Sequence, residues 1–268
     1  MRPARSGAVD QHEPAPRRYE RDSALRKVIV DVGAASSRRH VIPAWFTADI
    51  TEVWEKLRAQ GRPSMTVYVA GGLARTVARH PRLHAVRDLR GRVVLFDDVD
   101  MNISVEVEAD GQPFPMNHVL RSVQSRSLDD LQDEVQGVKT NPERSPTAGL
   151  TAPLRAYLAL PPPLRSRLLG SVRRFPDRQK ALMGTVGLTS VGMYGGGDGL
   201  GLPFLVHTLD VLVGGLETRP GFGRDGTLVP RQHLSIAVAA DHDIVDGAPL
   251  ARFLAEFRQD LERGQALR

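Results

Sequence analysis

The sequence predicts an α/β fold, on three observations. The strongest is the run from Val99 to Glu108, where apolar residues alternate with polar or charged ones, as in a strand that has one face in water. The apolar runs at 209–216 and 233–240 indicate two buried strands. Helical spacing near the C-terminus predicts a helix that buries Leu250, Phe253, Leu254, Phe257 and Leu261. A chain of 268 residues with such a mixture can bury a substantial core.

The N-terminal region begins with a polar stretch. Residues 1–25 are rich in Arg, Pro, Glu and Asp and show no apolar periodicity, so we expect a flexible arm there. The short apolar run from Val28 to Val32 predicts a strand, and a second strand is predicted from Arg39 to Ala48. Pro43 lies within the second run and favours a position at the edge of a sheet.

Two helices are predicted next. The first starts with the capping sequence at Asp49 and ends at Gly61, and the second spans 64–79, where Pro81 stops it. Three further elements are predicted downstream: a strand at 92–96, a strand at 114–119 paired with the alternating run, and a helix capped by Ser127.

A basic region follows at about 140–181, where the pattern loosens. Between Pro153 and Lys180 there are seven basic residues and one acidic residue. One basic helix is predicted from Leu164 to Phe175, with Leu164, Leu168 and Val172 on one face. We favour a solvated helix packed on its own domain, and the alternative is a basic surface that meets a partner, a membrane face or the phosphates of a nucleotide.

Composition sets outer limits on the class of protein. The net charge is +5, and 41% hydrophobic and 25% charged residues are ordinary for a globular protein. Because no apolar run is long enough to cross a bilayer and none follows the basic start, we expect a cytoplasmic protein. The absence of cysteine excludes a cysteine nucleophile, a thiolate metal site and a disulfide. Nucleic-acid binding is not expected, since no stacking aromatic residues accompany the basic cluster.

Neither a phosphate loop nor a metal site is predicted. The glycines at 195–201 are interpreted as a flexible turn, because Leu202-Pro203-Phe204 does not open a helix after them. His80 and His84 are four residues apart, but Pro81 breaks the helix that would align them, and no third ligand has a recognisable spacing. The isolated histidines, expected to be structural, are His40, His118, His207 and His233, with His207 also a candidate for lining a site.

One histidine stands in a more specific setting. The run from Leu234 leads through apolar residues to His242, and Asp246-Gly247 follows just before the terminal helix. An imidazole exchanges a proton near neutral pH, so a ring held rigidly at a strand end can serve as a general base. The same spacing fits a core histidine that is hydrogen-bonded to the backbone. The residues alone leave both interpretations open.

Two motifs indicate a family. The run from Asp241 to Gly247 resembles the His-x-x-x-Asp-Gly signature of the CoA-dependent acyltransferases, which include the catalytic cores of 2-oxoacid dehydrogenase complexes and chloramphenicol acetyltransferase. Residues 184–195 are similar to the family's Gly-Thr-x-Thr-x-Ser-Asn-x-Gly strand, and the resemblance runs, with gaps, from about His40 to Gly264. It implies a chloramphenicol acetyltransferase-like fold, a two-layer mixed β-sheet with helices on one face. Residues 26–268 would form this domain, with 140–181 as a basic insertion.

The resemblance also implies roles for five residues. His242 would be the general base, and Thr189 stands where the family has a serine that donates to the oxyanion. Ser190 occupies the neighbouring asparagine position and is a candidate for substrate binding. Because adjacent strand residues face opposite ways, only one of Thr189 and Ser190 can face the substrate. Asp246 would organise the loop, and Gly247 would let the chain turn.

The implied activity is transfer of an acyl group from acyl-CoA to a thiol, hydroxyl or amine on a small molecule or a lipoyl group. The CoA thioester would be a substrate, with no bound cofactor, and a homotrimer would form each site between subunits. Asp243 stands where the dehydrogenase-complex enzymes have arginine, which puts a lipoyl acceptor in question. With Thr189, this departure favours the alternative of a catalytically silent trimeric scaffold or ligand-binding protein. Nothing before the core resembles a lipoyl domain, so we expect a stand-alone enzyme or one that accepts a lipoyl arm from another protein.

Overall fold

A computed structural model describes residues 18–19, 24–61, 63–109, 112–145, 151–172, 174–191, 199–223 and 225–267. Most of the arm predicted at 1–25 and the first part of the glycine-rich stretch at 195–201 lie outside these residues. None of the described helices is long and apolar enough to span a bilayer.

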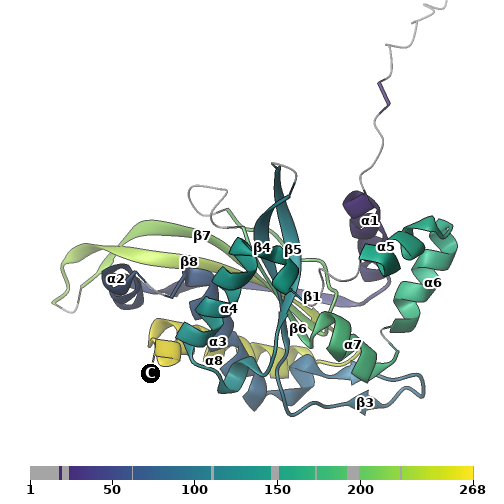
Figure 1. The fold of residues 1–268 in the computed structure, drawn as a ribbon. Helices are drawn as coiled ribbons and strands as arrows, with labels where there is room; N and C mark the ends of the chain where they lie inside the picture. Colours follow the sequence, from purple (N-terminus) through teal and green to yellow (C-terminus); the bar gives the residue numbers. More distant parts are fainter. Residues whose placement is uncertain are drawn as a thin grey trace, which may run out of the picture.

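A six-stranded mixed sheet forms the centre of the fold (Figure 1). The strands, in their order across the sheet, are β1 (Val41–Asp49), β8 (Leu228–Asp241), β7 (Leu209–Phe222), β6 (Val186–Ser190), β4 (Met101–Ala109) and β5 (Gln112–Leu120). The pairs β4–β6 and β6–β7 are parallel, and the other three pairs are antiparallel. Parallel pairing brings β6 into the middle of the sheet through long crossover connections.

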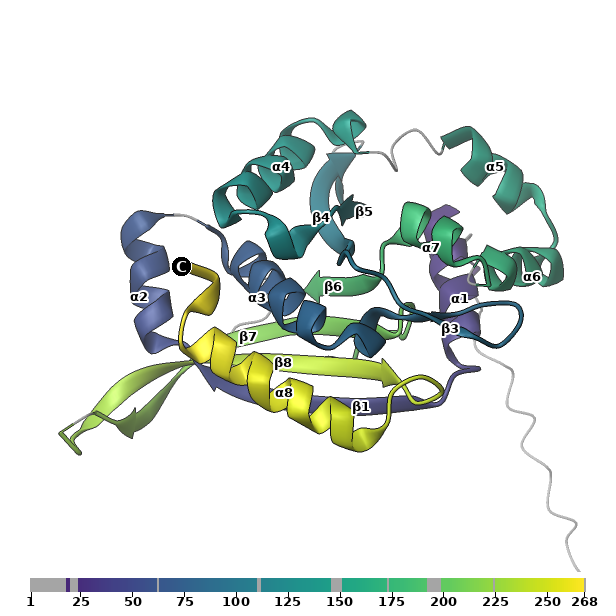
Figure 2. The ribbon, with the colours of Figure 1, turned by 90° about the horizontal axis from the view of Figure 1, so that it is seen from below.

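Four helices pack on one face of this sheet: α2 (Thr51–Gln60), α3 (Met65–Arg79), α4 (Leu128–Thr140) and α8 (Gly247–Glu262) (Figure 2). The ring of Phe257 on α8 meets Phe46 of β1 edge to face, with 5.7 Å between centroids. Tyr68 of α3 donates to the carbonyl of Leu261 at 2.6 Å, which ties α3 to α8. Short 3-10 helices occupy Pro81–His84, Val123–Ser125, Pro142–Arg144 and Gln265–Leu267. The predicted two-layer α/β fold is confirmed.

Strongly periodic segments fold as predicted. The alternating run forms β4 with Met101, Ile103, Val105 and Val107 buried, and it pairs with β5. β1, which contains Pro43, lies at the edge of the sheet as expected for a strand with proline. The side chains of Ser64 and Ser127 cap α3 and α4, and Gly61 ends α2 in the left-handed conformation.

Two strand predictions are wrong. Residues 28–32 lie within the helix α1 (Ala24–Ser36), because a short run of four apolar residues interrupted by Asp31 fits either structure and this one packs against other helices. The strand expected at 92–96 shrinks to β3 (Val93–Val94), which pairs with β2 (Val86–Arg87) in a separate two-stranded sheet.

The basic region forms three helices where one was predicted: α5 (Thr151–Ala159), α6 (Pro162–Val172) and α7 (Pro176–Met183). They gather with α1 beyond the end of the sheet (Figure 1). Leu164 and Leu168, placed on the apolar face of the predicted helix, are 47% and 45% exposed. Arg165 is buried instead, with its Nε 2.7 Å from Asp31 of α1. An ion pair, and not an apolar stripe, holds this side of α6 against α1.

Candidate functional site

The candidate site is the tight turn between β8 and α8. The apolar residues 234–240 bury β8, and Asp241 ends the strand while it is only 5% exposed. The backbone N–H groups of Ile244 and Val245 donate to the Asp241 carbonyl at 3.1 and 2.9 Å. The N–H of Asp243 donates to the Asp241 carboxylate at 3.1 Å. One aspartate therefore satisfies three donors of the turn and fixes its shape.

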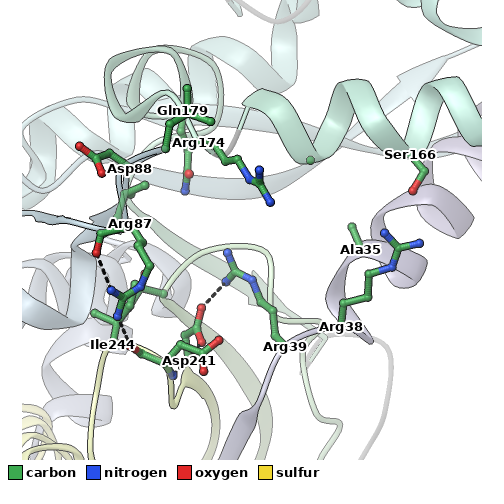
Figure 3. Close-up of a pocket in the computed structure, with 16 residues that line it drawn as sticks. Ala35, Arg38, Arg39, Arg87, Asp88, Ser166, Arg174, Gln179, Asp241 and Ile244 are labelled. Atoms are coloured by element: carbon green, nitrogen blue, oxygen red, sulfur yellow. Dashed lines mark hydrogen bonds and ion pairs between the residues drawn. The ribbon is translucent and has the colours of Figure 1, made fainter.

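Neighbouring strands anchor this turn. The N–H of Asp241 donates to the Thr208 carbonyl at 3.0 Å, and the N–H of His242 donates to the His40 carbonyl at 2.8 Å. The guanidinium of Arg39 lies 3.3 Å from the Asp241 carboxylate (Figure 3) and also donates to the His207 carbonyl. Residues at the starts of β1 and β7 thus hold the backbone of His242 in place.

The imidazole of His242 is available for chemistry. Its side chain is 52% exposed, and no hydrogen bond to the ring is present among the described residues. The nearest carboxylate is that of Asp246, 3.9 Å from Nδ1, which is beyond hydrogen-bond reach. The interpretation as a core histidine is wrong, because the bonded backbone lies at the surface and the ring projects from it. A half-exposed, rigidly mounted imidazole fits a general base.

The flanking residues differ from expectation. The Asp246 side chain is 84% exposed and caps no helix N–H, so the organising role predicted for it belongs to Asp241. Gly247 begins α8 and has no left-handed φ, so the turn does not depend on a glycine there. Asp243 accepts from His40 Nδ1 at 2.9 Å, and this hydrogen bond raises the pKa of His40.

Thr189 and Ser190 lie elsewhere in the chain. Both are half-buried at the end of β6, where Thr189 pairs with Leu212 of β7. Leu212 in turn pairs with Ala237 of β8, five residues before His242. At about 3.3 Å per residue, Thr189 and His242 are separated by roughly 16 Å along the strand direction. A single chain does not bring the predicted base and the predicted oxyanion donor together.

Two further histidines, His207 and His118, have structural partners. His207 bonds through Nδ1 to Asp210 at 2.7 Å and through Nε2 to the Met183 carbonyl at 2.8 Å. Gly187 makes room for this pair, since a Cβ on it would lie 1.9 Å from the Asp210 carboxylate. His118 bonds to Glu134 at 2.7 Å and to Ser145 at 3.0 Å.

His80 and His84, which are four residues apart in the sequence, have different surroundings in the structure. His80 bonds to Glu256 at 2.6 Å, whereas His84 is fully buried, and its Nδ1 lies 3.3 Å from the Thr185 hydroxyl. Desolvation by burial lowers the pKa of His84 to about 4. Within the described part of the chain, no group of three His, Cys, Asp or Glu side chains is placed to hold a metal ion.

Sequence reasoning missed Asp241 and Arg39. The signal that could have found Asp241 is a carboxylate at the end of an apolar strand, since a buried charge requires a partner. Its partner could not be identified, because Arg39 lies at the other end of the chain and one of many arginines would fit.

Comparison with known proteins confirms the family resemblance. Residues 179–267 match the family model for the 2-oxoacid dehydrogenases acyltransferase catalytic domain. The lipoamide acyltransferase component of the mitochondrial branched-chain alpha-keto acid dehydrogenase complex of Arabidopsis thaliana is 33% identical over 84 residues, which cover 31% of this chain and 17% of the relative. The Caenorhabditis elegans counterpart is 29% identical over 34% of this chain and 20% of its own length. The similarity in sequence therefore spans a fifth or less of these curated relatives.

The fold is similar over a much longer range. A dihydrolipoamide acetyltransferase of Azotobacter vinelandii, studied for the catalytic roles of a serine, a histidine and an asparagine, superposes with a TM-score of 0.70 at 16% identity, covering 100% of this chain and 99% of that one. A catalytic core of the Thermoplasma acidophilum 2-oxoacid dehydrogenase complex gives 0.64 at 17% identity, covering 92% and 99%. A chloramphenicol acetyltransferase gives 0.52 at 14% identity, covering 87% and 93%. This chain has their fold.

Proposed function

We propose that this chain, which has the fold of these acyltransferase cores and matches their family in its C-terminal third, is a CoA-dependent acyltransferase. The observation that carries the proposal is the mounting of His242: its backbone N–H donates to the His40 carbonyl, the residues that follow it in the turn donate to Asp241, and its ring remains half-exposed. This arrangement holds a base at a constant position and leaves its nitrogen open to an incoming acceptor.

The reaction follows from that geometry. A neutral imidazole of His242 accepts the proton of the acceptor's thiol, hydroxyl or amine as this group attacks the thioester carbonyl. The carbonyl oxygen becomes an oxyanion, which requires a hydrogen-bond donor. When the tetrahedral intermediate collapses, the C–S bond breaks and the CoA thiolate takes the proton from the imidazolium. The acceptor is acylated, CoA leaves as the thiol, and His242 returns to its neutral form.

Thr189 of a neighbouring subunit supplies the oxyanion donor in this proposal. Within one chain Thr189 lies too far from His242 along the sheet, so a site that uses both residues requires two chains. A threonine hydroxyl donates the same hydrogen bond as the serine that the family has at this position. The half-buried Ser190, one residue on, faces the other side of β6 and serves to bind substrate or to support the strand.

The acceptor class is proposed to be a small thiol, hydroxyl or amine, or a lipoyl group on another protein. The carboxylate of Asp243, next to His242, is hydrogen-bonded to His40. It therefore leaves the imidazole of His242 open to the acceptor.

The test is a panel of acyl-CoAs and acceptors, with release of the free CoA thiol as the measurement. We expect acceptor-dependent release that falls about 10²- to 10⁴-fold in His242→Gln. Thr189→Val should lower kcat by about 10²- to 10³-fold, whereas Thr189→Ser should retain most of it. His233→Gln is the matched control, since His233 lies on β8 at the level of Asp49, far from the turn.

Absence of release with every acyl-CoA and acceptor pair would overturn the enzyme proposal and favour the catalytically silent scaffold or ligand-binding protein. Equal activity in wild-type protein and His242→Gln would exclude His242 as the base.

A further inference from the structure

A cavity lies beside the turn that carries His242. It has a volume of about 520 Å³, within the usual range for small-molecule sites (Figure 3). Its walls come from four parts of the fold: the end of α1, the β2–β3 hairpin, the helices α6 and α7, and the turn after β8. The part of the basic region that forms α6 and α7 therefore closes one side of this cavity.

The cavity is rich in arginine. Four arginines line it: Arg38, Arg39, Arg87 and Arg174. Two of them bind protein atoms, since Arg39 pairs with Asp241, and Arg87 donates to the carbonyls of Gly91 and Asp243. The guanidinium groups of Arg38 and Arg174 have no hydrogen-bond or ion-pair partner among the described residues. In Figure 3 the Arg174 side chain extends from α6–α7 into the space above Arg39.

The acidic residues of the cavity do not neutralise these two groups. Asp88 is held by Arg92 at 2.7 Å, Asp241 by Arg39 at 3.3 Å, and Asp243 by His40 at 2.9 Å. Each carboxylate already has a cationic or imidazole partner. Two guanidinium groups that share a concave site and have no carboxylate partner there are suited to bind an external anion with several acceptor oxygens.

A buried amide adds a separate observation. Gln179 of α7 lines the cavity and is 1% exposed, and its Oε1 accepts no hydrogen bond among the described residues. A buried polar atom without a partner is destabilising. In Figure 3 the side chain points from α7 toward the interior of the cavity. A polar ligand there would provide the missing contact.

The cavity is distinct from the face where the imidazole is presented. Asp241, Asp243 and Ile244 line it, but His242 does not. The same cavity contains the two arginines that hold the turn, one at the Asp241 carboxylate and one at the Asp243 carbonyl. A molecule bound between Arg38 and Arg174 would lie next to these contacts.

We propose that this cavity is a second ligand site, which binds a small molecule bearing a phosphate group through Arg38, Arg174 and Gln179. It goes beyond the proposed acyl transfer, because binding there needs no reaction at His242. The phosphate can belong to a separate effector or to the phosphorylated end of CoA, and these are two sources of one chemistry.

Isothermal titration calorimetry with the full chain tests the proposal, with inorganic phosphate and ADP as probes. We expect saturable binding of ADP to wild-type protein, weakened at least tenfold in Arg174→Gln and in Arg38→Gln. Arg167→Gln is the matched control, because Arg167 is an exposed arginine of α6 that does not line the cavity, and its affinity should equal that of the wild type. Gln179→Leu should also weaken binding.

Two results would overturn the site. One is no saturable binding of ADP or phosphate at millimolar concentration. The other is equal affinity in wild type, Arg174→Gln and Arg38→Gln, which would place the anion elsewhere. Displacement of ADP by CoA but not by pantetheine would identify CoA as the source of the phosphate, and simultaneous binding of ADP and CoA would identify a separate effector. Neither arm depends on acyl transfer, so failure of the enzyme proposal leaves this test intact.

Discussion

At the residue scale, Asp241 controls the geometry of the candidate site. It is buried, accepts three backbone hydrogen bonds from the turn and pairs with Arg39. The neighbouring Asp246, which belongs to the sequence motif, is exposed and lies 3.9 Å from the imidazole. The position of His242 therefore depends on a carboxylate one residue before it, which makes Asp241 a positioning residue.

Asp241→Asn should lower kcat by about 10- to 100-fold, with little change in KM for acyl-CoA. Asparagine keeps an oxygen for the Asp243 N–H but loses the charge that holds Arg39, so the turn shifts relative to the substrate. Steady-state kinetics measures the split between kcat and KM. Asp246→Asn is the control, and a larger loss of kcat in this exposed variant would contradict the assignment.

Gly187→Ala should destabilise the protein by about 1–3 kcal/mol, because the added Cβ would meet the Asp210 carboxylate at 1.9 Å and His207 at 2.8 Å. Urea unfolding measures the change. Gly170→Ala is the matched control, since nothing lies within 4 Å of a Cβ there and a helical alanine adds about 0.5–1 kcal/mol. Equal effects of the two substitutions would show that His207 and Asp210 tolerate a side chain at position 187.

At the element scale, the helices beside the sheet are held by polar contacts that local patterns do not reveal. Asp31 of α1 accepts from Arg165 of α6 at 2.7 Å and from the Tyr157 hydroxyl of α5 at 2.8 Å. The period of β4 identified that strand because one of its faces is buried in the core. The run at 28–32 gave no such signal, since its neighbours α5 and α6 lie more than a hundred residues away along the chain. Similarly, the local motif located His242, but it could not reveal Arg39 as the partner of Asp241.

The contact between α1, α5 and α6 should weaken in acid. The hydrogen bond from Arg165 is the main cause that lowers the pKa of Asp31, so its contribution to stability is present above the ordinary aspartate pKa of 3.8 and is lost as the pH falls through the lowered value. Thermal unfolding between pH 5 and pH 3 should show a smaller decrease in melting temperature for Asp31→Asn than for wild type. Tyr157→Phe keeps the titrating carboxylate but removes a second hydrogen bond that lowers the pKa of Asp31, so its slope should lie between those of Asp31→Asn and wild type. Identical slopes in wild type and Asp31→Asn would contradict this origin of the acid sensitivity.

At the scale of the whole molecule, the β7–β8 pair extends beyond the rest of the sheet. Among the described residues, its outer part, from Glu217 and His233 to Phe222 and Leu228, pairs with no further strand except β1 at its base (Figure 1). Phe222 and Leu228 pair at the far end and are 74% and 70% exposed. An exposed apolar pair on a projecting arm is typical of a surface that another subunit covers. This arm suits the proposed trimer, in which Thr189 of one chain meets His242 of another.

Light scattering should give a mass three times that of the 29.4 kDa chain. The double substitution Phe222→Ser and Leu228→Ser should lower this mass and abolish acyl transfer, while circular dichroism stays unchanged, because only the interface loses apolar contact. Leu95→Ser is the control, since Leu95 is 53% exposed and lies away from the arm. A wild-type mass of one chain at micromolar concentration would exclude the shared site.

The β2–β3 hairpin offers a route to alter this protein without touching its reactive groups. Arg87 of β2 donates to the Asp243 carbonyl, so the small hairpin supplies one of the hydrogen bonds that hold the turn next to the imidazole. Residues 88–92 between its strands form a short loop, which supplies Asp88, Leu89 and Gly91 to the cavity wall and accepts from Arg87 at the Gly91 carbonyl. Changes of loop length there would alter how firmly Arg87 holds the turn of His242, so the hairpin couples the proposed ligand site to the position of the imidazole.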